Sequence, residues 1–67
     1  MTWDELKEKA KEIGYKEQAF LGEALTKDSA YHEITFYKNG NIEYNDDYVI
    51  AFDRTPEQML MIMRGLE

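Results

Sequence analysis

The chain has 67 residues, a formal net charge of −6, no cysteine and one histidine. Its length fits a single domain near the lower size limit for a self-sufficient core, and the lack of cysteine excludes disulfides and thiolate metal sites. Residues 28–67 contain three Lys/Arg and eight Asp/Glu, a net charge of −5. Direct binding to nucleic acid is therefore not expected, because it requires a basic surface.

The hydropathy pattern indicates neither membrane insertion nor secretion. No apolar run approaches the ~18 residues that a spanning helix needs. The N-terminal sequence MTWDELKEKAKE is charged and amphipathic, and it lacks the apolar run of a signal peptide. We therefore predict a small, soluble, acidic protein of the cytoplasm with no membrane partner, and the lack of cysteine fits a reducing compartment.

The first predicted element is an amphipathic helix that begins after Thr2. Thr2 and Glu5 have the spacing of a capping box, in which each side chain satisfies a free backbone amide of the other residue. Gly14 is placed to end the helix in a left-handed conformation. Trp3 is interpreted as a core residue rather than as a stacking platform for a ligand. One apolar stripe at spacings of three and four residues is expected to face the core: Trp3, Leu6, Ala10 and Ile13.

Residues 15–30 fit two different structures. A short helix would be lined by Phe20, Ala24 and Leu25, and the Ala, Leu and Glu content of the segment favours it. Gly22 opposes this helix, because Gly costs about 1 kcal/mol relative to Ala in a helix interior. Hydrophobic periodicity does not decide between the helix and an extended segment.

The extended alternative is a strand over residues 17–21 that adds to one edge of the sheet. With either structure, we expect Phe20 and Leu25 to help close the core. Residues 27–29, Lys-Asp-Ser, are interpreted as a loop that leads into the next strand.

Apolar and polar residues alternate through residues 31–52, which is typical of half-buried strands joined by tight turns. The dipeptide Asn39-Gly40 is a strong hairpin signal. A two-residue turn there would pair Tyr37 with Ile42 and divide the apolar side chains between both faces of the sheet.

A three-residue loop over residues 38–40 keeps the apolar side chains on one face. Phe36 then lies opposite Ile42, and Ile34 lies opposite Tyr44. The glycine of this loop, Gly40, takes the left-handed position of a type I turn with a bulge, where the absence of Cβ avoids strain.

A three-residue loop over residues 45–47 is predicted for the second turn, because Asn and Asp side chains bond readily to nearby backbone groups. This loop pairs Tyr44 with Tyr48 and Ile42 with Ile50. The core face of the meander is then apolar: Ile34, Phe36, Ile42, Tyr44, Tyr48, Ile50 and Phe52. The outer face comprises Glu33, Thr35, Tyr37, Asn41, Glu43, Val49 and Ala51. It is mostly polar, with a small apolar patch at Tyr37, Val49 and Ala51.

A second helix is predicted from Pro56 onward. Thr55 and Gln58 form another capping box, and Pro56 occupies the first helical position, where its missing N–H costs nothing. Met61 lies on the side opposite the apolar stripe. The stripe comprises Met59, Ile62, Met63 and Leu66, with Leu60 at its edge. Leu66 fits the helix, and the sequence leaves open whether Leu66-Glu67 is native or a cloning remnant.

These elements predict an α+β fold that forms a single domain over residues 1–67. A three-stranded antiparallel meander carries an N-terminal and a C-terminal helix on one face. Residues 15–30 remain either a short helix or an added edge strand.

Two segments, ITFYKNGNIEY and DRTPEQMLMIMRGLE after YVIAF, resemble a group of short hypothetical proteins of Gram-positive bacteria and their prophages. In this group an amphipathic N-terminal helix precedes an FYK-x-G-x-I hairpin and an RTPEQM helix start. The resemblance covers about half of the chain and rests on a turn and a helix cap. It implies an architecture and an origin in a Gram-positive bacterium or one of its prophages, and it implies no activity and no functional residue.

No constellation of residues predicts catalysis, a cofactor site or a metal site. His32 is the single histidine, so a zinc site, which needs several N or S ligands, is not expected. The oxygen-rich residues 39–47 lack the spacing of a calcium-binding EF-hand loop. Glu33 and Glu43 share an open sheet face that offers no cleft for acid–base chemistry. We therefore predict that the protein is not an enzyme.

Two functions remain open. The first is a small protein-interaction module that binds an unknown protein partner or a second copy of itself through an exposed apolar surface, here Tyr37, Val49, Ala51 and Met61. The second is an acidic decoy that mimics nucleic acid and blocks a DNA-binding protein. A decoy needs carboxylates in rows, whereas an interaction module needs a contiguous apolar patch.

Overall fold

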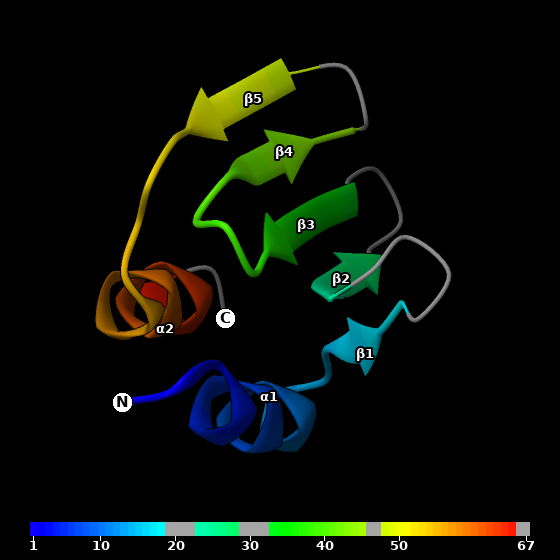
Figure 1. Ribbon diagram of the computed structural model, residues 1–67. Helices are drawn as coiled ribbons and strands as arrows, with labels where there is room; N and C mark the ends of the chain where they lie inside the picture. The colour runs from blue at the N-terminus through cyan, green and yellow to red at the C-terminus, as the bar shows by residue number, and fades with distance from the viewer. Residues whose placement is uncertain (19–22, 29–32, 46–47, 66–67) are drawn as a thin grey trace.

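The computed structural model describes residues 1–18, 23–28, 33–45 and 48–65. Five strands form one antiparallel sheet in chain order, and the two helices lie together on one side of it (Figure 1). The elements are α1 (Trp3–Glu12), β1 (Lys16–Glu17), β2 (Ala24–Asp28), β3 (Glu33–Tyr37), β4 (Ile42–Tyr44), β5 (Tyr48–Ala51) and α2 (Pro56–Gly65). The α+β class and the antiparallel sheet agree with the sequence prediction, and the sheet has two strands more than predicted.

The helix α1 has the predicted boundaries. The Glu5 amide donates to Thr2 Oγ1 over 3.2 Å, and the Thr2 amide donates to Glu5 Oε1 over 3.3 Å, which completes the capping box. Gly14 follows the helix with φ +97°, the left-handed conformation expected of a terminating glycine. Three residues of the predicted stripe are buried and the fourth is half-buried: Trp3, Leu6, Ala10 and Ile13.

The segment that follows α1 is extended, so the short-helix alternative is wrong for its described residues. The strand β1 is an added edge strand, but it lies at Lys16–Glu17 rather than over 17–21. Residues 19–22, which include Phe20, lie outside the described residues. Leu25 is fully buried opposite Phe36 in the next strand, which is the contact with the core that was expected.

Lys27 and Asp28 belong to β2 and not to a loop, because β2 pairs with β3 along its whole length. The Lys27 ammonium donates to the carbonyl oxygen of Ile13 over 2.9 Å and lies 5.5 Å from the ring centroid of Tyr15. It therefore satisfies a carbonyl group just beyond the end of α1, where a positive charge is favourable. This long-range contact has no local signal in the sequence.

The predicted register of the central hairpin is confirmed. Phe36 lies opposite Ile42 and Ile34 opposite Tyr44. Gly40 has φ +93°, as the three-residue loop requires. The hydrophobic pattern therefore identified the loop length correctly, since the alternative two-residue turn would have placed Phe36 and Ile42 on opposite faces.

The predicted register of the second hairpin is confirmed at one end and wrong at the other. Tyr44 pairs with Tyr48, but Ile42 pairs with Ala51 instead of Ile50, because a β-bulge adds one residue to β5. The small side chain of Ala51 consequently packs against the core from a half-buried position. Tyr48, Ile50 and Phe52 are exposed, and their predicted place in the core is wrong.

The core lies between the two helices and strands β2 to β4. Its residues are Trp3, Leu6, Ala10, Tyr15, Leu25, Ile34, Phe36, Ile42, Met59, Leu60 and Met63. The rings of Tyr15 and Phe36 meet edge to face, with their centroids 5.6 Å apart. Leu60 is buried and Ile62 only half-buried, which reverses the predicted roles of these two residues. Leu66 lies outside the described residues.

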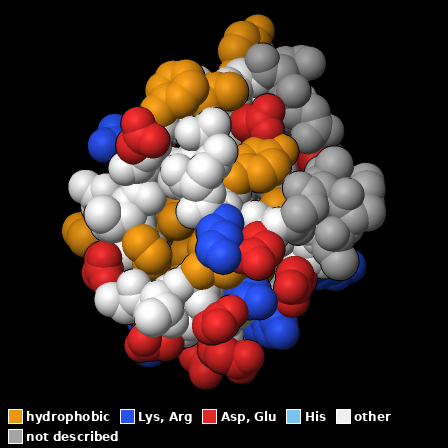
Figure 2. All heavy atoms as spheres, in the orientation of Figure 1, with side chains coloured by type: hydrophobic (Ala, Val, Ile, Leu, Met, Phe, Trp, Pro, Cys, Tyr) orange, Lys and Arg blue, Asp and Glu red, His pale blue; other side chains and the backbone are white. Residues whose placement is uncertain are grey.

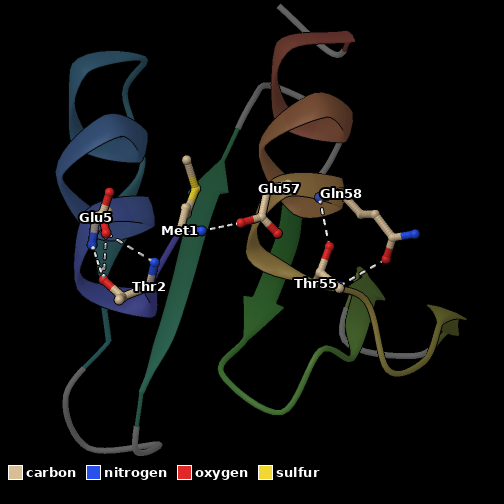
Figure 3. A network of polar contacts seen from close by, with 6 residues as sticks. All are labelled: Met1, Thr2, Glu5, Thr55, Glu57 and Gln58. Atoms are coloured by element: carbon tan, nitrogen blue, oxygen red, sulfur yellow. Dashed lines mark hydrogen bonds and ion pairs between the residues drawn. The ribbon is translucent and has the colours of Figure 1, made fainter.

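Polar contacts cap the start of each helix, and one contact links the two starts (Figure 3). The Thr55 amide donates to Gln58 Oε1 over 2.9 Å and the Gln58 amide to Thr55 Oγ1 over 3.2 Å, which forms the predicted second capping box. The N-terminal ammonium group of Met1 forms an ion pair with the carboxylate of Glu57. This pair joins the chain before α1 to the first turn of α2.

Candidate interaction surface

The two edges of the sheet differ in length and chemistry. One edge is β1, which contains only Lys16 and Glu17, both exposed. The Glu17 carboxylate lies 3.5 Å from Lys7 Nζ and 4.0 Å from Lys11 Nζ. A very short edge strand with charged side chains discourages pairing with another strand. The β1 edge is therefore protected.

The other edge, β5, is longer and apolar. Within it Tyr48 is 66% exposed, Val49 42% and Ile50 55%, and Phe52, which follows the strand, is 61% exposed. In the described part of the chain, β4 is the only strand that borders β5. Hydrophobic side chains gather at the end of the molecule where β5 lies (Figures 1 and 2). We call Tyr48, Val49, Ile50 and Phe52 the β5 surface.

The position of β5 in the sheet explains its exposure. The helices cover the strands nearer the middle, and β5 lies at the far end of the sheet from α1 (Figure 1). Tyr48 lies opposite Tyr44, and Val49 lies opposite Glu43, so these two neighbouring side chains point to opposite faces of the sheet. The β5 surface therefore presents apolar groups on both faces of one strand.

A shallow depression lies on α2 and on the chain that leads into it. Its volume is about 320 Å³, and it is lined by Arg54, Gln58, Met61 and Ile62. Met61 is 73% exposed, as predicted from its place on the helix opposite the buried stripe. The first of the lining residues, Arg54, lies two positions after Phe52 in the chain. We call the hollow that these residues line the α2 depression.

The four residues predicted to form an interaction surface do not form one patch. Val49 and Met61 are exposed. Ala51 is half-buried against the core, because the bulge places it beside Ile42 rather than on the outer face. Tyr37 is half-buried in β3 and lies opposite Ala24, two strands away from β5.

Sequence reasoning missed the largest part of the exposed apolar surface, namely Tyr48, Ile50 and Phe52. Ile50 and Phe52 were assigned to the core because alternation in the stretch YVIAF was extended across the bulge. Tyr48 has the predicted register, and it was assigned to the core because the helices were expected to cover this strand. One signal was present in the sequence: residues 48–52 contain no charged residue, unlike the preceding strands. A strand with apolar groups on both faces is typical of one that is covered on both sides.

The charges around the β5 surface are mainly negative. Glu43 pairs with Val49 across the sheet, and Asp53 is exposed immediately after Phe52. In the sequence, Asp46 and Asp47 precede the strand. Arg54 is the one basic residue close in sequence to these acids, and it forms no ion pair with another described residue.

The described residues do not bring together the groups that other functions need. No three of their His, Cys, Asp or Glu side chains form a cluster that could hold a metal ion. No helix among them is long and apolar enough to cross a membrane.

Compared with known proteins, the chain matches no family model, no curated protein and no solved structure. The functional inference below therefore rests on the residues of β5 and α2.

Proposed function

We propose that this chain is a small, non-enzymatic protein-interaction module that binds a protein partner through the β5 surface. The observation that carries the proposal is the exposure of Tyr48, Ile50 and Phe52 on an edge strand. Single exposed apolar residues are ordinary on protein surfaces. A group of large apolar side chains on a strand edge is typical of a binding surface. Such an edge promotes aggregation when no partner covers it.

The contrast between the two edges supports this proposal. The charged side chains of Lys16 and Glu17 discourage another strand from pairing with β1, whereas β5 has no charged residue from Tyr48 to Ala51. Large aromatic and aliphatic side chains are also those that dominate binding energy at interfaces. Burial of one such side chain contributes about 1.5–3 kcal/mol, so loss of a single residue should weaken binding about tenfold or more.

The acidic-decoy alternative has weaker support from the charge pattern. Several carboxylates lie beside lysines: Glu23 lies 2.9 Å from Lys38 Nζ, and Asp4 lies 3.3 Å from Lys7 Nζ. A nucleic-acid mimic needs uninterrupted rows of negative charge, since the phosphate backbone presents one charge every few ångströms. Interspersed acids and bases are the usual pattern of a surface that keeps a protein in solution.

A comparative capture experiment tests the proposal. The tagged chain and the variants Ile50→Asp and Phe52→Asp are incubated with lysate of the source cell, and captured proteins are quantified by mass spectrometry. Lys9→Gln, on the exposed side of α1, is the control. We expect at least one protein that the parent and the control capture equally and that both β5 variants lose.

Circular dichroism must find the variants folded, which the exposure of both residues predicts. Captured proteins that are insensitive to both substitutions would contradict a role for the β5 surface. Capture restricted to DNA-binding proteins, lost when acidic residues are neutralised and not when the β5 residues are changed, would favour the decoy.

A further inference from the structure

Resting on the proposed function, the geometry points to one mode of binding and one kind of partner. We infer that an extended segment of another protein adds to the β5 edge as a sixth strand. This segment has apolar residues at alternate positions and Lys or Arg at its ends. The inference combines three observations: a free strand edge, apolar side chains on both of its faces, and a surplus of carboxylates around it.

The free edge determines that the partner is extended. An edge strand presents a row of backbone N–H and C=O groups, and an added strand can pair with them. Within the described residues, no strand occupies the side of β5 that faces away from β4. An added helix would leave these backbone groups without partners, whereas an added strand continues the antiparallel order already present from β1 to β5.

The two faces of β5 determine the apolar pattern of the partner. Tyr48 projects on the face of Tyr44, and Val49 on the face of Glu43. Because side chains of a strand alternate, a neighbouring strand with apolar groups at alternate positions covers one of these faces. The Tyr48 face is the more exposed of the two, so it is the face that the partner's apolar residues cover.

The bulge at Ile50 limits the contribution of backbone pairing. The extra residue interrupts the regular ladder and bends the strand, so a partner can form few regular hydrogen bonds with four residues. Side-chain contacts with Ile50 and Phe52 must therefore supply much of the affinity. This requirement makes the interaction sensitive to substitutions of these residues as well as to changes in the partner's backbone.

The charge around β5 determines the ends of the partner segment. Asp46 and Asp47 precede the strand and Asp53 and Arg54 follow it, a net charge of −2 for the four residues. Glu43 adds a further carboxylate beside Val49. Basic residues that flank the apolar positions of the partner complement this charge, which raises the association rate and makes it dependent on salt.

A second copy of this chain is a poorer occupant of the same edge. Two β5 strands paired antiparallel about a twofold axis would bring the described acidic residues that border the strand, Glu43 and Asp53, of both copies to one interface. Each chain also carries a net charge of −6, so the two copies repel each other. A basic-flanked segment of another protein meets neither difficulty.

Synthetic peptides test this inference directly. The probe is a fluorescent peptide, Lys-Lys-Val-Thr-Val-Thr-Val-Lys-Lys, and the matched control replaces all four lysines with glutamate. A third peptide keeps the basic sequence and carries N-methyl groups at alternate residues along one edge, which remove backbone donors. A fourth peptide carries the N-methyl groups along the opposite edge of the same sequence, because only one edge of the peptide pairs with β5. Binding of all four peptides is followed by fluorescence polarisation at low and high salt.

We expect the basic peptide to bind at least tenfold more tightly than the acidic one and to weaken as salt increases. One of the two N-methylated peptides should bind more weakly than the unmodified basic peptide. Ile50→Asp should lose most of the affinity, because side chains supply much of it, while Lys9→Gln should bind as the parent does. Equal affinity for the basic and acidic peptides, or full binding by both N-methylated peptides, would overturn the inference. So would the failure of every peptide to bind.

The result separates the two proposals. If the capture experiment yields a partner that depends on β5 but no peptide binds, the interaction function stands and strand addition is wrong. Sedimentation of the unliganded chain tests the second copy as occupant. A concentration-dependent dimer that Ile50→Asp abolishes would replace the heterologous partner with a second copy.

Discussion

The backbone amide of Arg54 donates a hydrogen bond to the carbonyl oxygen of Gly40 over 3.0 Å. This contact holds the chain between β5 and α2 against the loop of the central hairpin. Gly40 has φ +93°, and an added Cβ would lie 2.5 Å from Arg54 N and 2.8 Å from the carbonyl carbon of Asp53. Both atoms belong to the backbone, so neither can move aside without shifting the start of α2.

We expect Gly40→Ala to destabilise the protein by at least about 2 kcal/mol, because left-handed strain and overlap with the Arg54 backbone act together. Chemical denaturation monitored by the fluorescence of the single tryptophan, Trp3, measures this change. Gly65→Ala is the matched control. Apart from its chain neighbours and the backbone of its own helix, no described residue has an atom within 4 Å of the added Cβ, so this variant should be neutral or up to about 1 kcal/mol more stable. Equal effects at both glycines would contradict the close approach.

Phe36 and Ile50 distinguish the core from the exposed strand edge. Phe36 is fully buried, and Phe36→Ala should cost about 3–5 kcal/mol, a large part of the stability of a domain this small. The variant should therefore be largely unfolded by circular dichroism. Ile50→Ala should change the free energy of unfolding by no more than about 0.5 kcal/mol, because Ile50 is already exposed. A large loss of stability from Ile50→Ala would show that the side chain of Ile50 is buried in the core.

The ion pair between the Met1 ammonium and Glu57 predicts a window of pH in which it stabilises the fold. A hydrogen bond from this amine and its positive charge lower the pKa of Glu57 below its ordinary 4.5, and Glu57 in turn raises the pKa of the amine above its ordinary 8.0. The contribution of Glu57 is lost as the pH falls through its lowered pKa. The contribution of the amine is lost as the pH rises through its raised pKa.

Glu57→Gln should therefore lower the melting temperature most between about pH 5 and pH 8, with the difference from the parent shrinking on both sides. The effect should be small and should decrease with salt, because the pair is exposed to solvent. Thermal melts across pH test this, with Glu8→Gln as an exposed control on α1. A difference that is constant from acid to alkaline pH would exclude the ion pair as its cause.

Met61 tests whether the α2 depression extends the interaction surface. It is 73% exposed, so Met61→Glu should leave the melting temperature almost unchanged. If partner binding or self-association covers α2, the substitution should weaken it by at least tenfold, because a carboxylate would be desolvated there. Capture of the β5-dependent partner tests the first case, and sedimentation at increasing concentration tests the second. Unchanged capture and a strictly monomeric chain would confine the interaction to β5.

The sequence by itself determined the features that depend on neighbouring residues. Thr2 with Glu5 and Thr55 with Gln58 predicted the starts of both helices, because a capping box is complete within one helical turn. The spacing of Phe36 and Ile42 around Gly40 determined the loop length, since only one register keeps both side chains on the core face. The exposure of Met61 followed from helical periodicity in the same way.

Only the tertiary structure decided the features that depend on distant residues. Ala24 and Leu25 are good helix formers, but their pairing with β3 makes them a strand, because burial against Phe36 outweighs local propensity. The bulge at Ile50 shifts the register of β5 by one residue without any local sign. The uncharged residues 48–52 distinguish this strand from the others in the sequence. The exposure of Tyr48, Ile50 and Phe52 nevertheless depends on where the helices end across the sheet, which the residues of β5 do not determine.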